Sequence, residues 1–253
     1  MHGVIGRQTA RIARPVAPAD ETPSAFYLTE MIADLKRGVS LLERLSLEEV
    51  RTVRRASTVV QADAGDTIFH QGDPHNGIYL IEKGRVRTFY AGPSGKEITL
   101  AYWTPGHFVG GPEVFGGGTH IWSGVAVEKT RLAYLPGATI RGLVRSMPTF
   151  AECIIEGLVE KGKCYSALVQ MLGTRSVTER LAHVLLILAE IDRKPGDQLV
   201  VSRRITHDQL ASMVGSTRQW VTMTLARFQK AGHIEIDRNV LIVRDPASLR
   251  AAL

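Results

Sequence analysis

Glycines divide the stretch from about Thr58 to Pro136 into short runs of β-branched and aromatic residues, and this pattern limits the folds open to the chain. The runs are TIFHQGD, GIYLIEKGRVRTFY, EITLAYWTPG and VAVEKTRLAYLPG. The glycines stand at positions 65, 72, 77, 84, 92, 95 and 106. β-Branched and aromatic residues favour strands, and glycine favours the turns between them. Strands this short, with turns this frequent, predict a barrel or a double-sheet jelly roll.

The chain before this stretch has two parts. Residues 1–24 carry Arg7, Arg11 and Arg14 but no apolar segment of the kind found in a secretory signal, so we expect a flexible basic tail. From Phe26 to Ser57, apolar residues recur at spacings of three and four, which predicts helix. No apolar run approaches the roughly 18 residues that span a bilayer. We therefore expect a cytoplasmic protein with no membrane partner.

A long helix is predicted from Pro148, a favourable first-turn residue, to about Leu172. Six residues on it follow spacings of four, three, four, three and four: Ile154, Leu158, Lys161, Tyr165, Leu168 and Leu172. This is the heptad spacing of a coiled coil with one polar interruption. A helix buried in the core of one subunit would show the same period. The position of the helix between a β region and a helical region favours a dimer seam.

Both cysteines of the chain, Cys153 and Cys164, fall on this predicted helix. A rise of about 1.5 Å per residue places them about 16 Å apart, beyond the reach of a disulfide within one chain. Two cysteines also cannot supply the four ligands of an iron–sulfur cluster in one subunit. We expect both thiols to pack as small buried hydrophobic groups.

The region that starts at Arg175 combines helix and turn signals. VTERLAHVLLILAEI predicts a helix, and DRKPGDQLVVSRR predicts a loop. Thr206 then stands three residues before Gln209, the spacing of a capping box, and Gly215 ends the short helix that follows. The chain closes with HIEIDRNVLIVRD, which predicts a short hairpin in which Asn239 tolerates a left-handed turn.

A second helix is predicted directly after Gly215, with Ser216 and Thr217 as its caps. Its apolar side consists of Val221, Leu225, Phe228 and, at the flank, Trp220. Two helices joined through one glycine turn and followed by a hairpin form a helix-turn-helix with a wing.

The exposed start of this second helix is the candidate reading surface. Its residues are Arg218, Gln219, Thr222 and Met223. A recognition helix presents this part to base edges in the major groove, where arginine can bond guanine and glutamine can bond adenine. The residues expected to hold phosphates are Thr206, Ser216, Thr217, Arg203 and Arg204. A helical hairpin with a solvated polar face is the alternative. Against it, the chain from position 175 carries twelve Lys and Arg against eight Asp and Glu, so we predict double-stranded DNA as a partner.

The order of β-roll, long helix and winged helix resembles the cAMP receptor protein and fumarate–nitrate regulator family of bacterial transcription factors, over about Leu35 to Val243. GDTIFHQGDPHNGIYLIEKGRVRTFY resembles the sensor-domain hairpins of that family, and ITHDQLASMVGSTRQWVTMTL resembles its reading motif. The resemblance implies an α+β fold: a jelly-roll, cyclic-nucleotide-binding-like β-roll over 25–147, a dimerisation helix over 148–173 and a winged helix-turn-helix over 174–253. It also implies a homodimer on a palindromic site, RNA polymerase as a partner, and an effector in the roll that repositions the reading helices.

The sequence departs from the cAMP-binding members of that family at the phosphate cassette. Those members carry a glutamate after a glycine, and an arginine–serine pair further on. Here Gly111 stands for the glutamate, Ile121 or Trp122 stands for the arginine, and only Ser123 is kept. A buried phosphate without its guanidinium would cost on the order of several kcal/mol, so we do not expect cAMP. Gln219 stands where those members carry glutamate, so we expect a palindrome whose halves are only TGT-like.

Two metal-containing branches of the family are also not expected. KEITLAYWTPG is similar to the carbon-monoxide-sensing haem branch, but the axial Cys and His of that branch would fall near Gly110 to Pro112, where neither occurs. The four-cysteine cluster of oxygen-sensing members needs more cysteines than this chain has. We therefore expect neither haem nor an iron–sulfur cluster.

Aromatic residues gather in the predicted roll and face the long helix. They are Tyr102, Trp103, Phe108, Phe115 and Trp122, opposite Tyr165 and Ser166. Glycines at 110, 111, 116, 117 and 118 leave room beside them. We expect an apolar or aromatic effector, bound by Tyr102, Phe108, Gly110, Gly111, Trp122, Ser123, Tyr165 and Ser166. Plain core packing, or a flexible flap without a ligand, would give the same pattern.

The histidines of this region do not predict a metal site. They are His70, His75, His107 and His120. A cupin-type metal enzyme would need two histidines one residue apart, and no such pair occurs. His107 is of most interest because it lies in the cassette. We therefore predict a transcription regulator and not an enzyme. The alternatives are a β-roll metal-dependent enzyme with an accessory helical domain, and a ligand-sensing module whose helical domain docks on protein.

Overall fold

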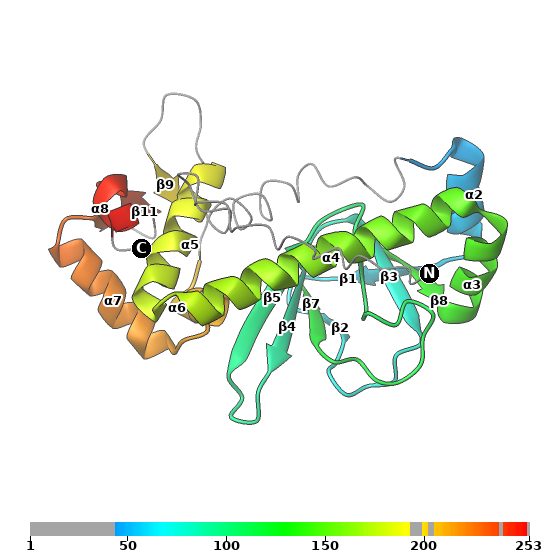
Figure 1. Ribbon diagram of the computed structural model, residues 1–253, viewed down its shortest axis with the longest axis horizontal. Helices are drawn as coiled ribbons and strands as arrows, with labels where there is room; N and C mark the ends of the chain where they lie inside the picture. Colours follow the sequence, from blue (N-terminus) through cyan, green and yellow to red (C-terminus); the bar gives the residue numbers. More distant parts are fainter. Residues whose placement is uncertain (1–43, 193–198, 202–204, 238–239, 252–253) are drawn as a thin grey trace, which may run out of the picture.

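A computed structural model describes residues 44–192, 199–201, 205–237 and 240–251. The molecule is elongated, and helix α4 (Pro148–Thr174) runs along most of its length (Figure 1). Strands β1–β8 lie beside the first part of α4, and helices α5–α8 lie at its far end (Figure 1). This α+β arrangement is the one expected from the sequence.

Eight short strands form the β-roll as two antiparallel four-stranded sheets. The first has the order β1 (Thr58–Ala62), β8 (Thr130–Pro136), β3 (Gly77–Lys83) and β6 (Phe108–Val109). The second has the order β2 (Thr67–Phe69), β7 (Ser123–Ala126), β4 (Val86–Ala91) and β5 (Glu97–Trp103). The prediction of a double-sheet roll is confirmed.

The interior of the roll is apolar. Ile81, Val86, Trp103 and Leu132 are almost fully buried in one cluster. The turn from β3 to β4 contains Gly84 at φ 85°, where a Cβ would lie 2.5 Å from Thr130 Oγ1. Only glycine fits this turn, because both its backbone angle and the space beside it exclude a side chain.

Two short helices flank the roll. Helix α2 (Leu47–Arg55) begins at a capping box formed by Ser46 and Glu49, and it is the described part of the helix predicted over 26–57. Helix α3 (Gly137–Ser146) was not predicted; it lies between β8 and α4. Together with Phe150 and Ile154 of α4, these helices bury a second apolar cluster against β3 and β8. The long helix is therefore part of the core of the roll, and this contact continues along α4 as far as Cys164 and Tyr165.

The C-terminal domain surrounds helix α5 (Val177–Asp192). Helices α6 (His207–Val214), α7 (Arg218–Lys230) and α8 (Pro246–Ala251) pack with it around one cluster that includes Leu185 and Val221. Strands β10 (Ile234–Asp237) and β11 (Val240–Val243) form the predicted wing hairpin; its turn residue Asn239 lies outside the described residues. Strand β9 (Val200–Val201), expected to be loop, pairs with β11 as a third strand, and α8 was not predicted.

A small apolar cluster joins the two halves of the molecule. Leu168 and Met171 at the end of α4 pack on Ile187 of α5 and on Leu100 of β5. None of the described helices is long and apolar enough to cross a membrane.

Candidate DNA-binding surface and effector domain

The helix-turn-helix is built from local hydrogen bonds that the sequence encodes. Thr206 is the N-cap of α6: its hydroxyl accepts from Gln209 N, and the Gln209 side chain accepts from Thr206 N at 2.8 Å. Thr217 is the N-cap of α7, and its hydroxyl accepts from Trp220 N at 3.2 Å. A hydroxyl that accepts one such bond still has its own proton to donate, so both threonines can bond a phosphate oxygen without losing the cap.

Gly215 makes the turn between the two helices. It is the C-cap of α6 in the left-handed conformation, at φ 64°. A Cβ at this position would lie 3.2 Å from a methyl carbon of Leu172 and 3.4 Å from the guanidinium of Arg180. The turn therefore lies against the end of α4 and the start of α5, and its left-handed backbone angle favours glycine.

The predicted reading residues share one exposed surface at the start of α7. Arg218, Gln219, Thr222 and Met223 are all exposed. Met223 is 65% exposed although it is apolar. The opposite side of the helix is buried through Val221, Leu225 and Phe228, as predicted. The helix therefore presents polar groups and one methionine outward at the end where a recognition helix contacts bases.

Two residues on α6 belong to this surface and were not predicted. His207 Nδ1 lies 2.7 Å from Thr222 Oγ1, whose hydroxyl donates to Arg218 O at 3.0 Å. Because the threonine proton is already used, His207 Nδ1 is the donor in this contact. The carboxylate of Asp208 lies 3.8 Å from Arg218 Nε, with both side chains exposed. The signal that could have found them is their position directly after the Thr206 cap.

The remaining phosphate candidates are less fully described. Ser216 is half-buried in the turn, and its backbone N–H donates to Ala211 O at 2.9 Å. Arg203 and Arg204 lie outside the described residues. Their role in binding phosphate stays a prediction.

In the roll, only part of the predicted effector set comes together. The rings of Trp122 and Tyr165 lie 5.5 Å apart, and both are half-buried. Burial raises the pKa of the Tyr165 hydroxyl above its usual value. Tyr102 is also half-buried, and burial raises its pKa as well. Phe108 is in the core, and the Ser123 hydroxyl accepts from Gln71 N at 2.9 Å, so neither is open to a ligand in this arrangement.

The glycines of the predicted set border a buried histidine. A Cβ on Gly111 would lie 2.7 Å from the ring of His75, and one on Gly110 would lie 2.9 Å from Gly77 O. The ring of His75 lies 4.5 Å from that of His120, whose Nδ1 bonds Gly110 O at 2.7 Å. Neither ring nitrogen of His75 has a hydrogen-bond partner among the described residues. These two histidines are a buried pair, although 45 residues separate them in the sequence.

Lys161 occupies the contact between α4 and the roll. Its ammonium group donates to Phe108 O at 2.6 Å and lies 3.6 Å from the centre of the Trp103 ring. Burial lowers the pKa of this group to about 7. Lys161, the polar position of the predicted dimer row, is enclosed by aromatic residues of its own chain.

Two family models match the chain over these two regions. The cyclic nucleotide-binding domain matches residues 59–147, and the Crp-like helix-turn-helix domain matches residues 179–252. The "Cyclic AMP receptor protein" of Thermus thermophilus is 30% identical over 213 residues, which cover 84% of this chain and 96% of that protein. This chain belongs to the CRP/FNR family of transcriptional regulators. Because the family consists of transcription regulators, the metal-dependent enzyme considered as an alternative is set aside.

Other CRP/FNR proteins support the same assignment. The "Global nitrogen regulator" of Synechococcus elongatus is 27% identical over 194 residues, which cover 76% of this chain and 87% of that protein. The structure of the c-di-GMP responsive global regulator CLP of Xanthomonas campestris matches 78% of this chain and 99% of its own, with a TM-score of 0.69 at 18% identity. The structure of a CooA variant from Carboxydothermus hydrogenoformans matches 85% of this chain and 95% of its own, with a TM-score of 0.68 at 24% identity. At these identities the two structures show a common fold.

CRP-like regulators bind DNA and form dimers, and two rows of α4 with heptad spacing differ in their exposure. The predicted row packs within its own chain: Ile154, Lys161 and Leu168 are buried, and Leu158, Tyr165 and Leu172 are half-buried. The row one residue further on repeats the same spacing and is exposed throughout: Ile155, Val159, Gly162, Ser166, Val169 and Gly173. The predicted row therefore packs mainly within its own chain, and a second row with the same heptad spacing is exposed. Ser166, expected at the effector, lies in this exposed row.

No metal site is apparent in the parts of the CRP/FNR regulator that the structure describes, since no group of three His, Cys, Asp or Glu there could hold an ion. Cys153 and Cys164 are free and buried, in agreement with the sequence analysis. His107, the histidine of most interest, has its Nδ1 3.1 Å from Thr104 O and its ring beside Trp103.

Proposed function

We propose that this CRP/FNR regulator reads a palindromic DNA site as a homodimer, with Arg218 and Gln219 contacting base edges. The observation that carries this proposal is the exposed set Arg218, Gln219, Thr222 and Met223 on the first turns of α7, directly after the Thr217 cap. Thr206, Thr217 and Ser216 lie at the helix starts, where they can hold phosphates and fix the register. Arg203 and Arg204 add two positive charges to the sequence just before the Thr206 cap.

The proposed dimer contact is the exposed row of α4. Ile155, Val159 and Val169 are 60%, 50% and 68% exposed, although all three are aliphatic. Gly162 and Ser166 stand between them and Gly173 follows, and a Cβ on either glycine would meet nothing within 4 Å in its own chain. Aliphatic and small residues at heptad spacing allow two helices to approach closely. A second copy of the same row is the partner that this row fits, because the two recognition helices of a palindrome reader must be related by a two-fold axis.

We further propose that the effector is an apolar or aromatic molecule and not cAMP. The position of the family's cassette glutamate is Gly111, where even a Cβ would collide with His75. The position of its arginine falls at Ile121 or Trp122, and the ring of Trp122 packs on Tyr165. Trp122, Tyr165 and Tyr102 supply half-buried aromatic surface and hydroxyl groups, which suit a ring-containing ligand. RNA polymerase is the protein partner we expect, and the cytoplasm is where a regulator of the bacterial chromosome acts.

Selection of sites from a random duplex pool at near-physiological salt, without added ligand, tests this function. We expect recovery of a two-fold palindrome, which would also show that the empty protein populates its binding form. Sequence-blind, salt-sensitive binding alone would contradict base readout by the empty protein, since phosphate contacts without base contacts give that behaviour. The same selection with candidate aromatic effectors would then identify an activating ligand. No DNA binding under any condition would favour the docking module considered as an alternative.

A further inference from the structure

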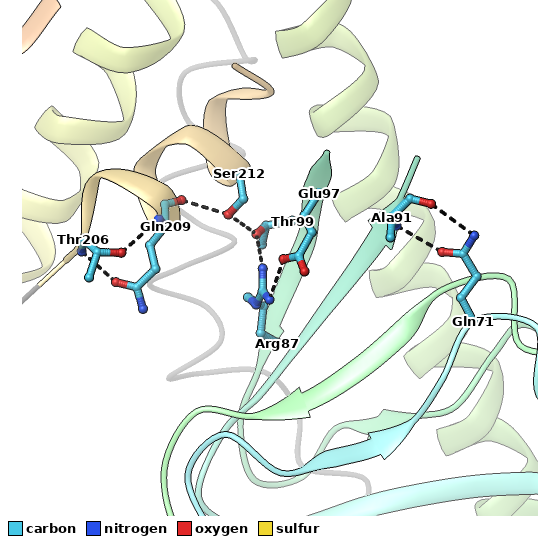
Figure 2. A network of polar contacts seen from close by, with 8 residues as sticks. All are labelled: Gln71, Arg87, Ala91, Glu97, Thr99, Thr206, Gln209 and Ser212. Carbon is cyan, nitrogen blue, oxygen red and sulfur yellow. Dashed lines mark hydrogen bonds and ion pairs between the residues drawn. The ribbon is translucent and has the colours of Figure 1, made fainter. Parts of the chain in front are cut away.

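The β4–β5 hairpin of the roll touches the helix-turn-helix directly, in addition to the connection through α4. Thr99 Oγ1 lies 3.0 Å from Ser212 Oγ on α6, and both residues are buried (Figure 2). Lys96 Nζ donates to Gly215 O at 2.8 Å, in the turn between α6 and α7. Two residues of one hairpin therefore hold the two ends of the same short segment of the DNA-binding domain.

Figure 2 shows this contact as part of a series of hydrogen bonds that runs from Gln209 to Glu97. Ser212 Oγ donates to Gln209 O at 2.9 Å, so its proton is already used and the Thr99 hydroxyl must donate to Ser212. Thr99 Oγ1 in turn accepts from Arg87 Nη1 at 3.4 Å, and Arg87 Nη2 donates to Glu97 Oε2 at 2.8 Å. Each hydroxyl in this series has a hydrogen-bond partner, and a satisfied buried pair such as Thr99 and Ser212 favours one geometry over others.

The hairpin itself is braced against the rest of the roll. The Gln71 side chain accepts from Ala91 N at 3.0 Å and donates to Ala91 O at 3.3 Å, where β4 ends (Figure 2). Strand β4 also pairs with β7 from Val86 to Phe89. The hairpin is therefore fixed to the rest of the roll, so a movement of the roll would also move the part of the hairpin that contacts α6.

The contact leaves the reading surface open. It involves the buried side of α6 and the carbonyl of the turn, while the Arg218 side chain is 70% exposed and Met223 is 65% exposed. Within the described ranges, no hydrogen bond or ion pair runs from the hairpin to Arg218, Gln219, Thr222 or Met223. A contact that blocked DNA binding by covering the recognition helix would involve these residues. The contact between the β4–β5 hairpin and α6 does not.

We propose that Thr99 and Lys96 are positioning residues for DNA recognition: the β4–β5 hairpin holds α6 so that the recognition helix keeps one orientation relative to the roll. The inference rests on the proposed function. Two recognition helices must enter the major groove about 34–36 Å apart, so an orientation fixed before binding reduces the ordering that binding requires. The link also gives the roll a route to the reader that does not pass along α4.

The first test compares Thr99→Val with Thr99→Ser on the palindrome that the wild-type protein selects, using fluorescence anisotropy. Loss of the hydroxyl is expected to raise Kd about three- to tenfold, the value of one buried hydrogen bond, and serine is expected to restore binding. Affinity for a duplex with a single half-site should not change, because a single reader needs no relative orientation. Thr88→Val is the matched control: it removes a buried hydroxyl from the same sheet, where Thr88 bonds Trp103 and Ala101 instead of α6.

Three results would overturn the proposal. Unchanged palindrome binding by Thr99→Val would show that the contact has no positioning role, and tighter binding would show that it holds the reader back. An equal loss on the half-site would indicate general damage to the domain. If the wild-type protein selects no palindrome at all, the proposed function fails before this inference is reached.

A reversible cross-link provides the second test. The oxygens of Thr99 and Ser212 are close enough for sulfurs in their place to meet, so Thr99→Cys with Ser212→Cys should form a disulfide on oxidation. The native thiols of Cys153 and Cys164 are buried and their pKa is raised by burial, so they should not compete as thiolates. We expect the oxidised protein to bind the palindrome at least as tightly as wild type, and reduction to weaken binding about three- to tenfold, since the hydroxyl pair is then absent. Failure to cross-link, or binding only after reduction, would contradict the proposal.

Discussion

The DNA-binding domain and the β-roll place their charged side chains in opposite surroundings. The Arg218 side chain is 70% exposed and lies 3.8 Å from exposed Asp208, whereas Lys161 is 7% exposed, lies over aromatic rings and donates to a backbone oxygen. An exposed charge acts by attraction that salt screens, while a buried charge acts on stability through its proton equilibrium. Removal of a charge should therefore change DNA binding in one region and folding in the other. Helix α4 belongs to both, because it carries Lys161 on one side and the proposed dimer row on the other.

The largest expected effect is on this shared helix. Val159→Glu places two like charges at a two-fold contact, so we expect loss of the dimer and a fall in palindrome affinity of about 100-fold or more, since two linked half-site contacts become independent. Sedimentation and anisotropy would measure the two effects. Gln170→Glu adds the same charge to an exposed position next to the row and should leave a dimer. A Val159→Glu protein that stays dimeric would place the contact on another surface.

Arg218→Ala comes next. We expect about 1–3 kcal/mol weaker binding to the selected palindrome, with relaxed discrimination at one base pair and no change in melting temperature. The reason is that Arg218 is exposed and supports no described packing. Binding constants for the palindrome, for single-base variants of it and for random DNA provide the measurement. An equal loss on random DNA would make Arg218 a phosphate contact.

Lys161→Met should change stability and leave the reading surface intact. The folded pKa of Lys161 is lowered by burial to about 7, so between about pH 7 and the ordinary lysine value near 10.5 the unfolded chain binds more protons than the folded one. Wild-type stability should therefore rise with pH across this window, by at most about 1.4 kcal/mol per pH unit from this group. Replacement by methionine removes that slope and is expected to stabilise the protein at pH 7 by about 1–3 kcal/mol, because a buried cation is exchanged for an apolar chain.

Denaturant unfolding at several pH values between 6 and 10 would measure this. Lys163→Met removes a lysine from the exposed side of the same helix turn and should leave the slope in place. If stability depends on pH in the same way for wild type and Lys161→Met, the pKa of Lys161 is not lowered by burial.

A smaller effect is expected from Asp208. Its carboxylate lies 3.8 Å from Arg218 Nε at the surface that should approach phosphates. Asp208→Asn should tighten DNA binding about two- to fivefold at low salt, the scale of an exposed charge interaction, and the gain should fade as salt is raised. A gain that survives high salt would mean that Asp208 acts by shape or hydrogen bonding. Glu179→Gln, in the same domain but at the start of α5, serves as the control for net charge.

The smallest effect concerns cAMP. Millimolar cAMP should leave the melting temperature unchanged, because a ligand stabilises only in proportion to its binding and Gly111 and Trp122 offer the phosphate no partner. A clear upward shift would show that the cassette binds cyclic nucleotides by other residues.

The geometry of the helix-turn-helix could be predicted from the sequence, but the side-chain contacts inside the sensor domain could not. The caps at Thr206 and Thr217 and the glycine at 215 are determined by neighbours within a few residues, so their geometry could be predicted. The pairing of His75 with His120, and of Thr99 with Ser212, depends on chain segments 45 and 113 residues apart, which no local pattern specifies. For α4, the period was visible, but two interleaved rows share it, and only burial against the roll distinguishes them.

The bond between Thr99 and Ser212 has a thermodynamic consequence for the pool of effector in a cell. A contact shared by sensor and reader carries a coupling free energy, and that energy is the same in both directions. If an effector changes the affinity for operator DNA by some factor, operator DNA changes the affinity for the effector by the same factor. Protein molecules seated on their sites would then hold the effector more or less tightly than free molecules, so the number of operators would help to set the effector concentration at which the regulator responds.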